Sequence, residues 1–140
     1  MYAARTAQTC LAEVYQRSRI VDVHRNQPYL AAWTLAADLT LLDLRGVFAT
    51  RMGASTAIHS GPRPRAQRWA VALYAAYPAL DGIAYCSSMN GNADAFALNE
   101  RALNQTPFPL TPNVNRMLAD ALIADLIDEA AEDLRYMVRR

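Results

Sequence analysis

The basic side chains limit the chemistry that this chain can perform. All fourteen of them are arginine, and lysine is absent. Without lysine, the chain cannot hold phosphates through a P-loop lysine, form a Schiff base with pyridoxal phosphate or use a lysine nucleophile. Phosphate binding would rely on bidentate arginine contacts. The net charge is only +1, so no overall field draws the protein to nucleic acid or to a membrane surface.

Three of the arginines, Arg63, Arg65 and Arg68, lie at the predicted start of a helix. Positive charge opposes the helix dipole at that end, which favours a binding role such as a phosphate clamp or a nucleic-acid groove. The simpler interpretation is a solvated helix start. Because the net charge of +1 argues against a nucleic-acid partner, we expect no direct contact with nucleic acid.

The thiol and imidazole groups do not have the spacing of a metal site. Cys10 and Cys86 form no CxxC pair, and His24 and His59 have no ligand spacing to them. We therefore expect no metal. The cysteines are interpreted as buried reduced thiols, and the histidines as surface or structural groups.

The length of 140 residues is enough for one domain. A hydrophobic content of 53% with 19% charged residues is typical of a globular chain. No apolar run reaches the roughly 18 residues of a membrane-spanning helix, and no secretory signal pattern precedes the first patterned segment. We expect a single cytoplasmic domain over 1–140 with no membrane contact.

Local patterns predict a mixture of helices and strands. Thr6 is a plausible N-cap for a helix that ends near residue 16, and Asp43 alternates outward in its strand, which indicates a structural role. Pro64 suits the first turn of a helix that Pro78 ends, and Trp69 and Tyr74 are expected in its core face. Further segments are strands at 18–23, 29–35 and 39–44, a helical turn at 48–54, and a hairpin over 83–98.

The C-terminal segment carries the strongest helical pattern. Thr111 and Pro112 read as cap and first turn, and apolar residues including Leu118, Leu122 and Leu126 recur as a stripe. We expect one helix over 112–139, about 42 Å long, with Leu122 buried and an acidic face toward solvent or a partner. Unequally spaced helices and strands favour an α+β fold rather than alternating βαβ units.

Three segments together resemble the RES-domain family. They are the opening "MYAARTAQTCLAEVYQ", the pair "LTLLDLRG" and "RWAVALYAAYP", and the strand and turn "DGIAYCSSMNG". The resemblance covers roughly residues 2–102, and the order and spacing of the three motifs are specific. It implies a small mixed sheet flanked by helices, similar to ADP-ribosyltransferases, with the long C-terminal helix added.

The family is named for an Arg, a Glu and a Ser, and its members resemble NAD-consuming toxins that pair with a helix-turn-helix antitoxin of the Xre type. Carried over by motif, the Glu is Glu13, the Ser is Ser87 and the pocket Tyr is Tyr2. Glu13 would steady the cationic ribose when nicotinamide leaves, Tyr2 would stack on nicotinamide, and Tyr85 would lie near the substrate. Arg5 does not occupy a position of the family motif, but it is close to Tyr2 in the sequence and is expected to reach the substrate pocket. The resemblance thus implies NAD as substrate and no separate cofactor.

The family's Arg should lie about ten residues before Tyr2, where this chain has nothing. The expectation is therefore a domain that lacks its N-terminal strands and turns over NAD poorly by itself. Four questions stay open. They are whether water, phosphate or a protein side chain attacks the ribose, whether Ser87 or Ser88 faces the pocket, whether copies of the chain associate, and whether the absent Arg reflects a fragment, a mis-assigned start or a true loss. The alternative is a catalytically inactive relative that acts as a protein-binding module.

Overall fold

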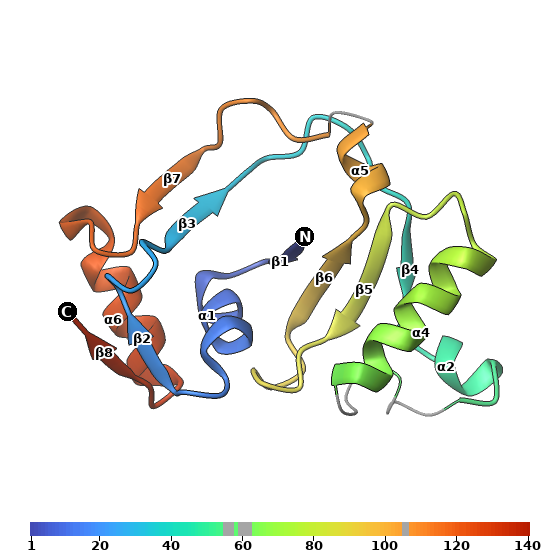
Figure 1. The fold of residues 1–140 in the computed structure, drawn as a ribbon, viewed down its shortest axis with the longest axis horizontal. Helices are drawn as coiled ribbons and strands as arrows, with labels where there is room; N and C mark the ends of the chain where they lie inside the picture. Colours follow the sequence, from blue (N-terminus) through green and yellow to red (C-terminus); the bar gives the residue numbers. More distant parts are fainter. Residues whose placement is uncertain (55–57, 59–62, 105–106) are drawn as a thin grey trace.

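The computed structural model describes residues 1–54, 58, 63–104 and 107–140. Its largest element is a four-stranded sheet in the order β1-β6-β5-β4. Strand β6 is antiparallel to both β1 and β5, whereas β4 runs parallel to β5. With helices on either side of it (Figure 1), this sheet confirms the expected α+β class. The strands are Tyr2–Ala4 (β1), Leu41–Asp43 (β4), Gly82–Cys86 (β5) and Asp94–Leu98 (β6).

Two helices pack beside this sheet: the short α2 (Phe48–Arg51) and α4 (Arg63–Ala76). Both match their sequence predictions, as does the antiparallel β5–β6 hairpin. No helix in the described ranges is long and apolar enough to cross a membrane. The buried side chains between sheet and helices are Leu44, Ala49, Ile58, Leu73 and Ile83.

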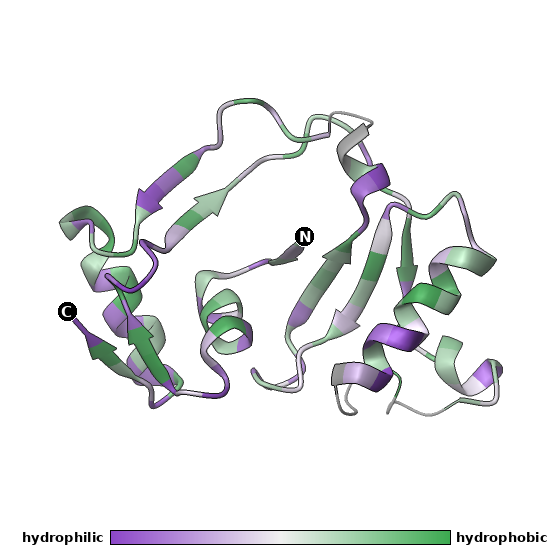
Figure 2. Cartoon of the chain, viewed as in Figure 1, coloured by the Kyte–Doolittle hydropathy of each residue, from purple (hydrophilic) through white to green (hydrophobic). Residues whose placement is uncertain are grey.

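A second hydrophobic core lies on the other side of the molecule. Helices α1 (Ala7–Tyr15) and α6 (Ala124–Asp133) contact each other beside two parallel strands, β2 (Ile20–Asp22) and β8 (Met137–Arg139). Figure 2 shows β2 as hydrophobic along much of its length. Thr6 is the N-cap of α1 and its hydroxyl accepts a hydrogen bond from the Thr9 amide at 3.2 Å, as expected. The buried side chains are Leu11, Val21, Val23, Leu118, Ile127, Ala130 and Ala131.

Strands β3 (Tyr29–Ala32) and β7 (Val114–Met117) form an antiparallel ribbon apart from the main sheet. In Figure 1 the segments that leave this ribbon pass over the top of the molecule toward α5 (Glu100–Asn104). Trp33 and Phe108 hold these segments together through an edge-to-face contact with ring centroids 5.9 Å apart.

The prediction of a single helix over 112–139 is wrong. This segment instead contains β7, a 3₁₀ turn (Ala121–Ile123), the ten-residue α6 and β8. The Asp120 carboxylate accepts a hydrogen bond from the Leu122 amide at 2.9 Å and so starts the helix late. Arg135, with φ at +54°, ends it early, because a left-handed residue cannot continue an α-helix.

The apolar residues of that segment therefore do not form one stripe. Leu118 and Ile127 are buried, but Leu122 is 76% exposed and Leu126 is 43% exposed. The expectation that Leu122 is core is thus wrong. Pairing of β7 with β3 and of β8 with β2 satisfies backbone groups that a continuous helix would have satisfied internally.

The Asp81-Gly82 pair positions β5 against its neighbours. The buried Asp81 carboxylate accepts a hydrogen bond from the Thr40 amide at 2.7 Å, and the Asp81 amide donates to the Thr40 carbonyl at 2.9 Å. A Cβ at Gly82 would lie 2.7 Å from the Ala97 carbonyl oxygen, so the close approach of β6 requires glycine here. The pair begins the strand that carries Tyr85 to the candidate site.

Candidate functional site

A cleft of about 740 Å³ lies between one face of the four-stranded sheet and helices α1 and α4. In the sheet, Tyr2 and Ile83 are both paired with Ala97, and all three line the cleft. Because side chains alternate between faces, Tyr85 projects to the same face as Ile83. Helix α1 contributes Glu13 to the opposite wall.

Glu13 and Ser87 are 74 positions apart, and the fold brings them into contact. The Ser87 hydroxyl donates to Glu13 Oε1 at 2.6 Å and accepts a hydrogen bond from the Met89 amide at 3.2 Å. Glu13 is half-buried and lines the cleft, whereas Ser87 is fully buried behind it. Ser88, the alternative serine, is exposed and lines the cleft directly.

The turn after β5 is fixed to α1 at a second point. The Asn90 side-chain amide donates to the buried Thr9 hydroxyl at 2.9 Å, and that hydroxyl also contacts the Thr6 hydroxyl at 2.9 Å. Thr9 and Glu13 are four residues apart, so they share one face of α1. Two hydrogen bonds, one helical turn apart, therefore hold the Glu13 carboxylate against this turn.

Three tyrosines line the cleft together with Glu13. Burial raises the pKa of Tyr85 well above its usual value, and the nearby Glu13 and Tyr2 raise it further. Burial also raises the pKa of Tyr74, whose hydroxyl donates to the Ala97 carbonyl at 2.8 Å. Both phenols are therefore held neutral to a higher pH than a phenol in water. Tyr85 is thus close to the Glu13 carboxylate, and Tyr2, the other expected substrate contact from the sheet, lies near Tyr85 in the same cleft.

Arg5 does not join them. Its side chain is 71% exposed and pairs with Asp94 at 3.1 Å, and Asp94 lies opposite Cys86 in the sheet, one residue out of phase with Tyr85. Arg45 also binds Asp94, at 2.6 Å, and holds Asp43 through two hydrogen bonds of 2.9 Å. Asp43 is thus structural, as expected, and Arg5 belongs to an ion-pair cluster on the face of the sheet away from the cleft.

The other described candidate groups are not among the residues that line the cleft. Arg65 and Arg68 are exposed at the start of α4, and His24 is exposed after β2. His59 lies outside the described residues. The two cysteines are unpaired, and both are half-buried rather than fully buried. The described part of the chain holds no group of three or more His, Cys, Asp and Glu side chains arranged so that they could bind a metal ion.

Sequence reasoning missed Trp69, which lines the cleft and is 37% exposed rather than core. Trp69 precedes Ala70, which packs against the core, and both line the cleft. The spacing of apolar residues along a helix gives no signal that separates a ring inside the core from one at its edge. With Tyr2, Tyr74 and Tyr85, Trp69 gives the cleft four aromatic rings.

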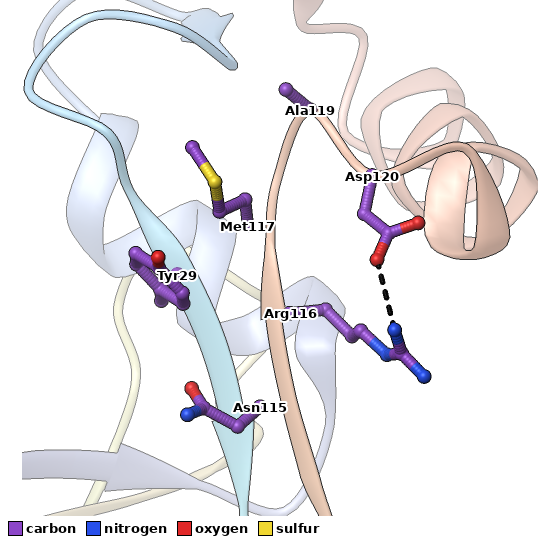
Figure 3. Close-up of a pocket in the computed structure, with 6 residues that line it drawn as sticks. All are labelled: Tyr29, Asn115, Arg116, Met117, Ala119 and Asp120. Carbon is purple, nitrogen blue, oxygen red and sulfur yellow. Dashed lines mark hydrogen bonds and ion pairs between the residues drawn. The ribbon is translucent and has the colours of Figure 1, made fainter.

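A separate hollow of about 380 Å³ lies on the β3–β7 ribbon. Figure 3 shows Tyr29 and Met117 on its two facing strands, with Arg116 turned toward Asp120, which it contacts at 3.2 Å. An exposed ion pair of this kind contributes little binding energy. The one carboxylate among the described residues of the hollow is thus paired, whereas the larger cleft holds Glu13 without a cationic partner among its described lining.

The larger cleft has the groups needed to stabilise a cation. Among the described residues that line it, Glu13 carries the only formal charge. Glu13 Oε2 accepts no hydrogen bond from a described residue, while Oε1 is held by Ser87. A carboxylate fixed in a largely apolar, aromatic site stabilises developing positive charge more strongly than one in water.

Comparison with protein families agrees with the motifs in the sequence. The family model described as "RES domain" matches residues 1–124, which include every residue of the cleft named above. A search of curated proteins and a search of solved structures each find no match. Because the family model spans most of the 140 residues, this chain belongs to the RES domain family.

Proposed function

We propose that this protein cleaves the bond between nicotinamide and ribose in NAD, as the toxin of a toxin–antitoxin pair. The observation that carries the proposal is the Glu13 carboxylate, which Ser87 holds at 2.6 Å in the wall of an aromatic cleft. Membership of the RES domain family supports it. In this proposal NAD is the substrate, no cofactor takes part, and the protein acts in the cytoplasm.

In the proposed reaction the bond between ribose C1′ and the pyridinium nitrogen breaks. Its electron pair goes to the nitrogen, so nicotinamide leaves neutral and the ribose becomes an oxocarbenium-like cation. Glu13 stabilises that cation, while Tyr2 and Tyr85 contact the leaving ring. Water, phosphate or a protein side chain then adds to C1′, with a water or hydroxyl acceptor releasing its proton. These acceptors correspond to glycohydrolase, phosphorylase and ADP-ribosyltransferase activity.

In this scheme Ser87 is a positioning residue rather than a contact of the substrate. Its hydroxyl is fully buried and bonds Glu13 and the Met89 amide. It thereby directs the free Glu13 Oε2 toward the cleft. The similarity to the ADP-ribosyltransferase fold that the family resemblance implies is part of this proposal.

One observation favours a second candidate, a non-catalytic protein-binding module. No arginine is found among the described residues of the cleft, and Arg5 is held by Asp94. Bidentate arginine contacts are the usual means of holding a diphosphate, so we expect weak NAD binding by these residues. In either case the proposed partner is an Xre-type helix-turn-helix antitoxin that covers the cleft. Self-association through β1, an edge strand, is a further proposal.

The test is release of nicotinamide from NAD at high substrate concentration. We compare the purified chain with Glu13→Gln and with Glu129→Gln, a matched variant at an exposed position on α6. Glu13→Gln should lower kcat by about 10²–10³-fold, the usual effect of removing one group that stabilises a transition state. Glu129→Gln should keep the parent rate. If the folded parent chain releases no nicotinamide, the binding module is favoured, and an unchanged rate in Glu13→Gln removes Glu13 from the mechanism.

A further inference from the structure

The cleft is unusual in its balance of charge and aromatic surface. Its described lining includes one carboxylate, Glu13, four aromatic side chains and no cationic side chain. Arg101 acts electrostatically on Tyr74, but it is not among the described residues of the lining, and it donates to the Pro78 carbonyl. The aromatic side chains are Tyr2, Trp69, Tyr74 and Tyr85.

Both features of this lining attract positive charge. Aromatic faces carry negative electrostatic potential and bind organic cations, Trp most strongly. Glu13 Oε2 has no hydrogen-bond donor among the described residues, so its charge is not neutralised within the cleft. For a phosphate group the same lining is unfavourable, because a carboxylate repels it and no described side chain balances its charge.

The two ends of a nicotinamide nucleotide differ in this respect. In the oxidised form the N-substituted nicotinamide ring is a pyridinium cation, whereas free nicotinamide and the reduced dihydropyridine ring are neutral. We propose that this cleft recognises the positive charge of the ring: it binds N-substituted pyridinium cations, does so without a phosphate, and discriminates against neutral pyridines. The inference rests on the proposed function for the identity of its natural substrate.

This recognition has a consequence for the reaction. Bond cleavage neutralises the pyridinium, so the product nicotinamide loses the interaction that held the substrate. The reduced dinucleotide, whose ring is neutral, is excluded for the same reason. The cleft therefore selects for oxidised substrate and favours release of the neutral product.

The experiment uses two probes of nearly the same shape, 1-methylnicotinamide (a cation) and nicotinamide (neutral), titrated separately by calorimetry into the full chain. In a partly desolvated aromatic site, a cationic ligand should have a Kd about tenfold lower than a neutral ligand of the same shape. Attraction to the Glu13 carboxylate should lower the Kd of the cation further. We expect 1-methylnicotinamide to bind at least about tenfold more tightly than nicotinamide.

Variants locate the source of the discrimination. Glu13→Gln should reduce the preference for the cation while keeping an oxygen to which Ser87 can donate, and Trp69→Leu should weaken the binding of 1-methylnicotinamide but not that of nicotinamide. The matched controls are Glu129→Gln and Trp33→Leu, since neither residue lines the cleft, and both should keep the parent values. Thermal unfolding checks that each variant is folded.

Equal affinities for the two probes, or binding of neither, overturn the inference. A preference that remains unchanged in both Glu13→Gln and Trp69→Leu overturns it as well, because other residues would then recognise the positive charge. The outcome is separable from that of the proposed function. If the chain prefers the cation but does not cleave NAD, the inference is supported and the proposed enzymatic function is contradicted. If it cleaves NAD without the preference, only the inference is contradicted.

Discussion

Replacing Ser87 by alanine is the most informative single change, because it separates the two adjacent serines. Ser87 is fully buried, and its hydroxyl donates to Glu13 at 2.6 Å and accepts from the Met89 amide at 3.2 Å. A hydrogen bond to a charged group contributes about 1.5–3 kcal/mol and an ordinary one about 1 kcal/mol. Because Glu13 is only half-buried, water partly replaces the lost donor. We therefore expect Ser87→Ala to lower the free energy of unfolding by about 2 kcal/mol.

Urea unfolding followed by circular dichroism measures this effect. With a slope of about 1–3 kcal/mol per molar urea, the midpoint for Ser87→Ala should fall by about 1 M. Ser88→Ala is the matched control: Ser88 is exposed, so its free energy of unfolding should stay within about 0.5 kcal/mol of the parent. Equal midpoints for the two variants would refute the role of the Ser87–Glu13 contact in holding the turn against α1.

Two further predictions test the packing of the C-terminal segment and the ion pairs of the sheet. Ile127→Asp should unfold the chain, because Ile127 is fully buried and an unpaired buried charge is strongly destabilising. Leu122→Asp should fold normally, because Leu122 is 76% exposed. Far-UV circular dichroism and gel filtration distinguish the two variants, and a folded Ile127→Asp protein would contradict the assignment of Ile127 to the core. Hydrogen bonds from Arg45 hold the pKa values of Asp43 and Asp94 below their usual value of 3.8, so their contribution to stability is present above about pH 4 and lost as the pH falls through the lower folded-state pKa. Urea midpoints measured from pH 6 down to pH 2 should decline over that range, and Arg45→Gln should decline less; an equal decline would show that other carboxylates are responsible.

Several elements were predictable from local sequence because local physical chemistry decides them. Thr6 caps α1 through the Thr9 amide, a contact within one turn of chain. The hairpin of β5 and β6 follows from two apolar runs separated by turn residues, and Asn92 and Gly91 adopt the positive φ that the turn requires. Helix α4 ends before Pro78, where proline prevents its continuation. None of these needs information from elsewhere in the chain.

The segment 112–139 shows where local reading fails. Its apolar spacing suits a helix, yet β7 pairs with β3 and β8 pairs with β2, each about 85 or more positions away in the chain. Those ladders satisfy backbone groups that the pattern of side chains does not report. A helical period in the sequence therefore identified α6 but not its ends, because strand partners outside the segment competed for its backbone.

The candidate site divides in the same way. By resemblance, the motifs predicted Glu13, Ser87, Tyr2 and Tyr85 as candidate site residues, since each lies in a short stretch that the family pattern specifies. Only the tertiary structure decided that Ser87 lies behind Glu13, that Trp69 lines the cleft, and that Arg5 faces away from it. The reason is the two-residue period of a strand: a shift of one position moves a side chain to the opposite face of the sheet, so membership of the site depends on register and on the elements packed against each face.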